Sequence, residues 1–277
     1  RSAETTNEEY CNLESLTTFP FKLPGLRNDT HAGLQLWLDA NEITDVPLDP
    51  DNPFQINSWP DASGNGNHMS KAWGDGPHLV EGPNGLQVVK YSNDRTNTST
   101  NFESTLRPEG YTVFAVSRYT GGDWERVITS NRNWLFGHHG RLANRFYFDG
   151  WVWGGDNSRD TNWRLNIAVH QGHDHAPDPA VNIYVTGEER VSGSTASNNS
   201  WFMPQRVEFG AYGNNGENSV CQVAEFMFFS GMLSDEDRQL LEGFLAHKYG
   251  FTLPNGHPYK DSGNPLNTTI EIGGESC

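Results

Sequence analysis

Short runs of β-branched and aromatic residues, separated by clusters of glycine and asparagine, recur along most of this chain. Residues 111–117 read Tyr-Thr-Val-Phe-Ala-Val-Ser, as expected of a buried strand. Turn clusters occupy residues 63–67, 154–157 and 213–216. Strands alternating with turn signals at intervals of roughly 8–20 residues predict an all-β sandwich. Further strands are predicted at residues 34–38, 87–91, 126–130, 145–148, 163–170, 181–185, 206–211 and 220–229.

One segment has helical character, at residues 235–249. Ser234 suits an N-cap, Asp237 completes a pair resembling a capping box, and Gly250 is a typical helix stop. We expect this helix to cover an edge or end of the sandwich. The residues expected on the sheet are Leu241, Phe244 and Leu245, and those expected in water are Glu236, Arg238 and Glu242.

Charge and hydropathy exclude several partners. The 19 Lys and Arg against 35 Asp and Glu leave a net charge of −16, so polyanionic nucleic acid and anionic membrane surfaces are unsuitable partners. No apolar run reaches the roughly 18 residues that a membrane span needs. The chain begins at Arg1 without a leader, from which we expect a secretion signal already removed and an extracellular or cell-surface location.

Cysteines and glycosylation sequons fit that location. Three cysteines allow one disulfide with a spare thiol, or a bridge to another chain: Cys11, Cys221 and Cys277. Four Asn-x-Ser/Thr sequons permit N-glycosylation, at Asn28, Asn97, Asn198 and Asn267.

Both ends of the chain differ from the strand-rich middle. We divide the chain into an N-terminal arm (1–31), one sandwich domain (32–262) and a polar tail (263–277). In the arm, Phe19, Phe21 and Leu23 alternate with polar or proline positions, which is typical of an edge strand. This strand could brace its own domain. Alternatively, it could pair with the next copy and generate a ring or filament, which a disulfide from a terminal cysteine could lock.

The segments 36–40 (Leu-Trp-Leu-Asp-Ala) and 59–68 (Trp-Pro-Asp-Ala-Ser-Gly-Asn-Gly-Asn-His), with 224–226, 245–250 and 257–259 near the other end, resemble the LamG-like, concanavalin A-like domains. This resemblance implies a jelly roll of two antiparallel sheets. The fold expected is therefore an all-β, two-sheet antiparallel jelly-roll sandwich with one C-terminal helix and extended terminal arms. Such folds host lectins, adhesion modules, glycoside hydrolases and polysaccharide lyases alike.

Residues 145–156 have the composition of a carbohydrate site, with flat aromatic rings beside hydrogen-bonding groups. Trp151 and Trp153 are two apart and should face one side of a strand. The alternative is that the tryptophans fill the core between the sheets. The candidate glycan-binding residues are Trp151, Trp153, Tyr147, Asp149, Asp156 and Trp124.

Two loops could hold metal ions. Asp61, Ser63 and Asn65 offer oxygen ligands for Ca²⁺ on a glycine-rich loop, although the same residues suit a hydrogen-bonded structural turn. Three histidines at 170, 173 and 175 could bind zinc, but a solvated hairpin loop is the favoured interpretation because their spacing matches no zinc motif.

Catalytic signatures are weak. The paired carboxylates of jelly-roll glucanases, in a Glu-x-Asp-x-x-Glu pattern, are absent from the sequence. Tyr147, His170 and Arg164 are one of many triples that could serve a lyase. We therefore predict a secreted, non-catalytic lectin-like module that binds glycans, assembles with copies of itself, or does both. The alternative is a polysaccharide-active enzyme of the same fold.

Overall fold

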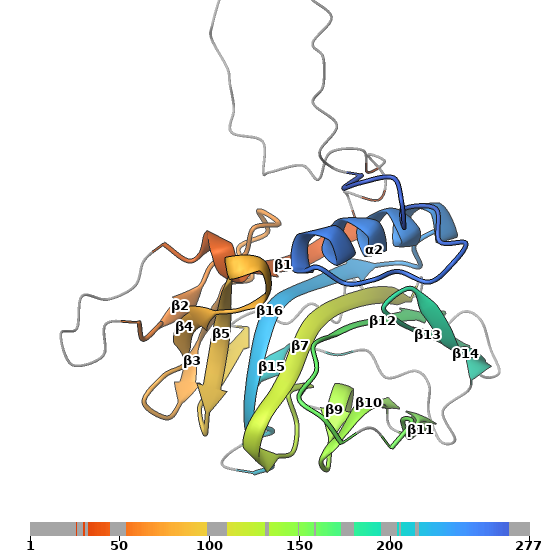
Figure 1. The fold of residues 1–277 in the computed structure, drawn as a ribbon. Coiled ribbons are helices and arrows are strands. Elements are labelled where there is room, and N and C mark those ends of the chain that lie inside the picture. Colours follow the sequence, from red (N-terminus) through yellow and green to blue (C-terminus); the bar gives the residue numbers. More distant parts are fainter. Residues whose placement is uncertain are drawn as a thin grey trace, which may run out of the picture.

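The fold is a sandwich of two antiparallel β-sheets with one helix on its outer side, seen in a computed structural model (Figure 1). This confirms the predicted fold class. The structure describes residues 26, 30, 33–44, 54–98, 110–130, 133–148, 150–157, 159–172, 180–194, 204, 206–213 and 216–265.

The first sheet contains the long central strands. Its order is β14-β13-β12-β7-β16-β5-β4, and β1 pairs with β16 beside this path. Non-consecutive neighbours such as β7 and β16 show that distant segments meet, as in Greek-key sandwiches. The strands are β1 (Leu34–Asp39), β4 (His78–Glu81), β5 (Gln87–Ser92), β7 (Tyr111–Trp124), β12 (Arg164–His170), β13 (Val181–Val185), β14 (Glu188–Ser194) and β16 (Ser219–Ser230).

The second sheet consists of shorter strands, in the order β11-β10-β9-β8-β15-β6-β3-β2. Two 3-10 helices connect strands of the sandwich, η1 (Ala40–Glu42) and η2 (Pro83–Gly85). The strands are β2 (Ser58–Trp59), β3 (Met69–Trp73), β6 (Arg95–Thr98), β8 (Ile128–Thr129), β9 (Trp134–His139), β10 (Leu142–Phe148), β11 (Trp151–Trp153) and β15 (Glu208–Phe209).

The main core lies between the two sheets, where alternate side chains of each strand point inward. Trp134 stacks on Phe148 with ring centroids 5.3 Å apart, which shows how aromatic side chains fill the gap. Cys221 lies in this core as a free thiol with 0% of its surface exposed, and burial raises the pKa of the thiol. No other chain can reach it there, so the predicted intermolecular link is left to Cys11 and Cys277, outside the described residues.

Helix α2 (Asp235–Tyr249) has the predicted bounds and caps. The Ser234 hydroxyl accepts a hydrogen bond from the Asp237 amide at 3.2 Å, and Gly250 ends the helix in the left-handed conformation. The helix packs across the outer face of the first sheet rather than at an edge, and Leu241 and Leu245 are buried in a second apolar cluster (Figure 1). Phe244 is half-buried against the same cluster.

The prediction that Arg238 and Glu242 lie in water is wrong. Both are buried, and the guanidinium donates to the Glu242 carboxylate at 2.8 Å. Arg238 lies over the Tyr184 ring of β13, with its guanidinium 3.7 Å from the ring centroid, and Glu242 is covered by the closing segment, residues 251–265. His257 contacts Glu242 at 2.9 Å, and a Cβ at Gly243 would lie 2.6 Å from Tyr259.

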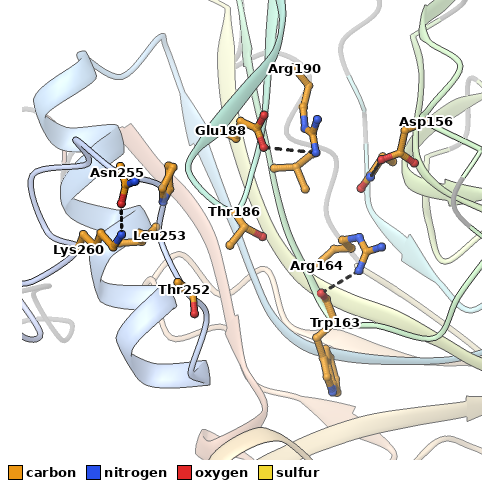
Figure 2. Close-up of a pocket in the computed structure, with 13 residues that line it drawn as sticks. Asp156, Trp163, Arg164, Thr186, Glu188, Arg190, Thr252, Leu253, Asn255 and Lys260 are labelled. Carbon is orange, nitrogen blue, oxygen red and sulfur yellow. Dashed lines mark hydrogen bonds and ion pairs between the residues drawn. The ribbon is translucent and has the colours of Figure 1, made fainter.

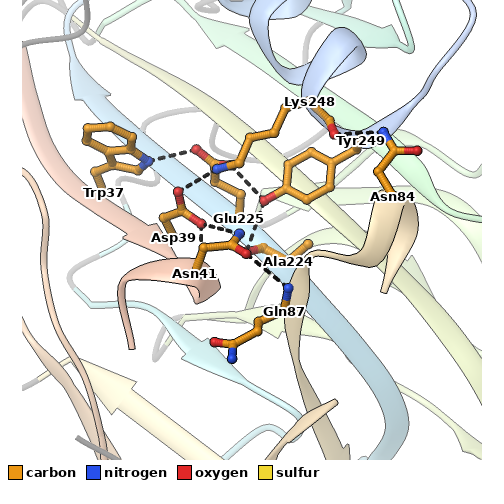
Figure 3. Close-up of polar contacts among 9 residues, drawn as sticks. All are labelled: Trp37, Asp39, Asn41, Asn84, Gln87, Ala224, Glu225, Lys248 and Tyr249. Carbon is orange, nitrogen blue, oxygen red and sulfur yellow. Dashed lines mark hydrogen bonds and ion pairs between the residues drawn. The ribbon is translucent and has the colours of Figure 1, made fainter. Parts of the chain in front are cut away.

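A buried cluster of charges joins α2 to the first sheet (Figure 3). Glu225 of β16 is 1% exposed and accepts hydrogen bonds from Trp37 at 2.8 Å, Lys248 at 2.7 Å and Tyr249 at 2.8 Å. Lys248 also contacts Asp39. Every oxygen of Glu225 therefore has a partner, which is the condition for burying a carboxylate.

Several predictions concern residues outside the described part of the chain and stay predictions, as does the division into domain and arms. Among the described residues, no helix has both the length and the apolar character needed to cross a membrane. The predicted residues that fall outside are Asp149, His173 and His175, the arm residues Phe19, Phe21 and Leu23, Cys11 and Cys277, and the sequons at Asn28, Asn198 and Asn267.

Candidate functional site

A cavity of about 520 Å³ opens where both sheets and the closing segment meet (Figure 2). Its walls come from β10, the loop after β11, the start of β12, the β13–β14 hairpin and residues 252–260. Most of the side chains around it are polar. The lining residues are Asn144, Asp156, Trp163, Arg164, Val185, Thr186, Glu188, Arg190, Thr252, Leu253, Pro254, Asn255 and Lys260.

The second sheet contributes Asn144 and Asp156. Asn144 has φ 58°, beside a register shift in β10, and is 1% exposed. Its side-chain amide donates to Asp156 Oδ2 at 3.1 Å, while its Oδ1 is buried and makes no hydrogen bond. Gly155 (φ 82°) passes so close that a Cβ there would lie 2.7 Å from the Ala143 carbonyl oxygen. The bulge in β10 and the loop after β11 thus fix this wall together.

The first sheet contributes Trp163 and Arg164. Arg164 donates to Asp160 Oδ2 at 2.8 Å and to the Trp163 carbonyl at 3.3 Å, which holds the guanidinium at the cavity. The Trp163 ring is half-buried, with the Arg118 guanidinium 4.8 Å from its centroid. A cation over an indole restrains the ring by an electrostatic attraction. This wall therefore contributes a fixed cation, while the Trp163 indole extends away from the other lining side chains and packs against the outer apolar cluster (Figure 2).

The third wall is the β13–β14 hairpin packed on the closing segment. Its turn places Gly187 so close to Leu253 and Pro254 that a Cβ would lie 2.9 Å from either side chain. Arg190 and Glu188 are exposed and form an ion pair at 3.4 Å. On the facing segment, Lys260 donates to the Asn255 side chain (Figure 2). The hairpin and the closing segment present both donors and acceptors.

The space between the sheets beyond this cavity is also polar. Asn166 follows Arg164 on the inward side of β12, and both of its side-chain polar atoms are buried without hydrogen bonds. Ser117 and His138 lie 3.4 Å apart there, both buried. Burial, reinforced by the charge of Arg164, lowers the pKa of His138 to about 3, so its imidazole is neutral at physiological pH. Because Ser117 is fully buried, this pair lacks the access that a nucleophile needs.

The predicted aromatic residues occupy two different places. Trp151 is 43% exposed, and its ring meets Tyr147 edge-on at 5.2 Å with the Arg145 guanidinium 5.0 Å away. Trp153 instead stacks on Phe146 at 6.1 Å, next to the core. The prediction that both indoles share one side is wrong, because the pairing of β10 with β11 shifts register between Phe146 and Tyr147.

Of the predicted glycan-binding residues, Asp156 lines the cavity. Trp124 is half-buried and stacks on Tyr119 at 5.1 Å beside the core. The lyase triple is dispersed: Tyr147 contacts Trp151, His170 is buried and stacks on Tyr111, and Arg164 lines the cavity. The roles of the predicted glycan-binding residues stay predictions.

The Asp61 loop has the geometry of a hydrogen-bonded turn. The Asp61 carboxylate accepts backbone N–H groups from Trp37 at 3.0 Å, Ser63 at 2.9 Å and Asn67 at 2.9 Å. The Asn65 amide donates to the Leu34 carbonyl at 2.7 Å. These bonds give the loop a structural role in holding β1, and Ca²⁺ binding by Asp61, Ser63 and Asn65 stays a prediction.

The remaining sequon within the described residues is Asn97, in the middle of β6. Its side chain is half-buried, and the strand is paired on both sides, with Ser70 of β3 and Glu208 of β15 opposite Asn97. Glycosylation at this position stays a prediction.

Sequence reasoning missed most of the cavity. Asn144, Arg190 and the pair Asn255 and Lys260 come from three separate segments, and no local pattern connects them. A usable signal was the alternation in β12, which places Arg164 and Asn166 on the inward side of a strand whose outward side is apolar. Polar residues at inward positions indicate a gap in the core.

Comparisons with known proteins support the fold. No family model and no curated protein matches the chain. A solved botulinum neurotoxin type C chain, described as interacting with two ganglioside molecules, aligns with TM-score 0.50 and 12% identity over 77% of this chain and 51% of that one. A botulinum neurotoxin serotype D binding domain aligns with TM-score 0.50 and 16% identity over 78% and 52%. This chain thus spans about half the length of these solved chains.

At these identities the likeness shows the fold alone. The β-sandwich implied by the LamG-like resemblance is confirmed as an architecture, and no match extends it to that family.

Proposed function

We propose that this chain is a saccharide-binding β-sandwich module and that the cavity of Figure 2 is its binding site. The observation that carries the proposal is a cavity of about 520 Å³ walled mainly by polar side chains, with Trp163 among its lining residues. Its volume lies in the range of about 300–1,000 Å³ typical of small-molecule sites. Most such sites are apolar, so a mainly polar lining favours a ligand rich in hydroxyl groups.

The lining supplies what a sugar ring needs. Trp163 is the aromatic residue of the lining, and a contact of its ring with C–H groups would be worth about 1–2 kcal/mol. Arg164 and Arg190 donate hydrogen bonds, and Asp156 accepts them. Because cations and carboxylates both line the space, hydroxyls that donate and accept find partners on every wall.

Trp151 and Tyr147 form a second candidate contact, on the outer face of the second sheet. The exposed indole is held by its edge-on contact with Tyr147, so little conformational entropy is lost when a sugar stacks on it. The ganglioside interaction of the neurotoxin type C chain is a precedent at the level of the fold.

Binding to a panel of neutral and acidic oligosaccharides, measured by calorimetry, tests the proposal. Trp163→Ala should weaken binding roughly 5–30-fold, corresponding to about 1–2 kcal/mol. Trp73→Ala is the matched control, because this indole is 38% exposed on β3, near the opposite edge of the second sheet. Binding unaffected by Trp163→Ala, or no binding to any saccharide, contradicts the assignment.

The extracellular location and self-association through the N-terminal arm are also part of the proposed function. The four N-glycosylation sequons fit the extracellular location, and the composition of residues 1–31 with the sheet edges at β14 and β4 supports the self-association. An edge strand presents unpaired backbone groups that an additional strand can use.

A further inference from the structure

Three metal-ligating side chains converge at turns of the sandwich, and none of them lines the cavity. Glu125 follows β7, His139 ends β9, and Glu217 precedes β16. Glu217 is far from the other two in the sequence, so no local motif predicts the three together. The fold alone brings an imidazole and two carboxylates together.

Their spacing suits an ion at the centre better than direct contacts. His139 Nε2 lies 3.7 Å from Glu125 Oε2 and 3.6 Å from Glu217 Oε1, and all three ligand atoms lie within 4.8 Å of one another. Distances of this kind are too long for hydrogen bonds. A point equidistant from the three atoms is about 1.9–2.4 Å from each, which overlaps the bond lengths of Zn²⁺ to nitrogen and oxygen.

Neighbouring side chains hold the ligands in place. Arg126 is 8% exposed and pairs with the second oxygen, Oε2, of Glu217, leaving Oε1 turned toward His139. The Tyr119 hydroxyl donates to the Glu125 carbonyl and so fixes the backbone beside that carboxylate. Outer contacts of this type orient metal ligands in proteins.

The charge balance favours a dication. Two carboxylates against the single guanidinium of Arg126 leave one negative charge when His139 is neutral. The chain as a whole carries −16, so its field attracts cations. The glutamate side chains are 44% and 38% exposed, which leaves an ion room for water or an external ligand.

We propose that Glu125, His139 and Glu217 bind a divalent transition-metal ion, with Zn²⁺ as the best match. An imidazole ligand favours such ions over Ca²⁺ and Mg²⁺, which prefer oxygen alone. Three protein ligands leave at least one coordination position open, as in zinc sites that bind water or substrate. The Trp151 ring lies 6.1 Å from the His139 ring, so a ligand held by the ion would also meet the exposed indole.

Zinc titration of the chelator-stripped full chain, by calorimetry and by melting temperature, tests this site. The wild type should bind one ion here and melt at a higher temperature with Zn²⁺, since a ligand that binds the native state stabilises it. His139→Gln should weaken this binding by at least roughly 10-fold, because even outer-shell changes cost 10–100-fold. Co²⁺ substitution gives an independent readout in the visible spectrum.

Two further variants make the result specific. Glu125→Gln should weaken binding like His139→Gln, whereas a double His173→Gln, His175→Gln variant should keep it. Equal zinc binding by wild type and His139→Gln, or loss of binding in the double variant, overturns the proposal in favour of the histidine-rich loop. Absence of any zinc-dependent heat or melting shift in the wild type also overturns it. Circular dichroism confirms that each variant is folded.

Discussion

Lys248 Nζ lies 2.7 Å from Glu225 Oε2 beneath helix α2 and also contacts Asp39, so that one ammonium group forms ion pairs with two carboxylates (Figure 3). Burial raises the pKa of Glu225 to about 7 and outweighs the attraction of Lys248, while the nearby charge of Asp39 raises it further. The carboxyl group of Glu225 is therefore easier to protonate in the folded protein than in the unfolded chain.

This relationship predicts a pH dependence of stability. Between pH 4.5, the ordinary pKa of glutamate, and pH 7, the folded state binds the proton that the unfolded state has released. The contribution of Glu225 to the free energy of unfolding is therefore lost as pH rises through this window. In Glu225→Gln, which keeps an acceptor for Trp37, that slope should disappear. Denaturant unfolding at a series of pH values measures it, and equal slopes in both proteins would refute the assignment.

The cap of α2 gives a prediction for stability. Ser234→Ala removes the hydroxyl that accepts the Asp237 amide and should lower the free energy of unfolding by about 1 kcal/mol. Ser58→Ala, at an exposed position of β2, is the control and should change little. Urea unfolding compares the two, and an unchanged midpoint for Ser234→Ala would count against the cap.

The glycine pair in the loop after β11 tests the wall of the cavity. Gly155→Ala places a Cβ 2.7 Å from the Ala143 carbonyl at a positive φ, and should cost about 1–3 kcal/mol while weakening saccharide binding. Gly154→Ala meets nothing within 4 Å and serves as the neighbouring control. Melting curves and calorimetry with one saccharide ligand measure both effects. If the two variants behave alike, this close approach does not shape the site.

The N-terminal arm predicts an oligomeric state. Without residues 1–30, the chain should be monomeric in solution, whereas the full chain should be larger, because the arm carries the strand proposed to pair with a neighbouring copy. Light scattering under non-reducing conditions gives both masses. Cys11→Ser in the full chain separates a disulfide contribution from strand pairing. Identical monomeric masses would contradict assembly through the arm and favour the alternative, in which the arm braces its own domain.

Local patterns predicted the helix and the long strands of the first sheet, whereas β2, β3, β4, β6, β9 and β14 fell outside every predicted strand. The alternation in β12 and the caps of α2 depend on residues close in sequence, so their boundaries could be placed to within a few residues. The side of a strand or helix on which each side chain lies was harder to predict. A register shift beside Tyr147 separates Trp151 from Trp153, and the Tyr184 ring of β13 covers Arg238, and neither effect leaves a periodic signal.

The candidate sites depend on contacts between distant segments. The cavity joins Asn144 of β10 to Lys260 beyond the helix, and the proposed metal site joins Glu125 to Glu217. Loop composition instead pointed to Asp61, whose carboxylate accepts three backbone amides. Composition identifies residues capable of binding, and the pairing of strands decides which of them meet.

The closing segment has one side on the helix and the other on the cavity. His257 and Tyr259 contact α2, while Leu253 and Lys260 line the cavity. A saccharide bound there would hold the segment down, and local opening of the helix would have to release it. Saccharide binding in the cavity and opening of the helix are then thermodynamically linked. A bound saccharide should therefore slow amide hydrogen exchange in α2, although the helix itself lies outside the cavity wall.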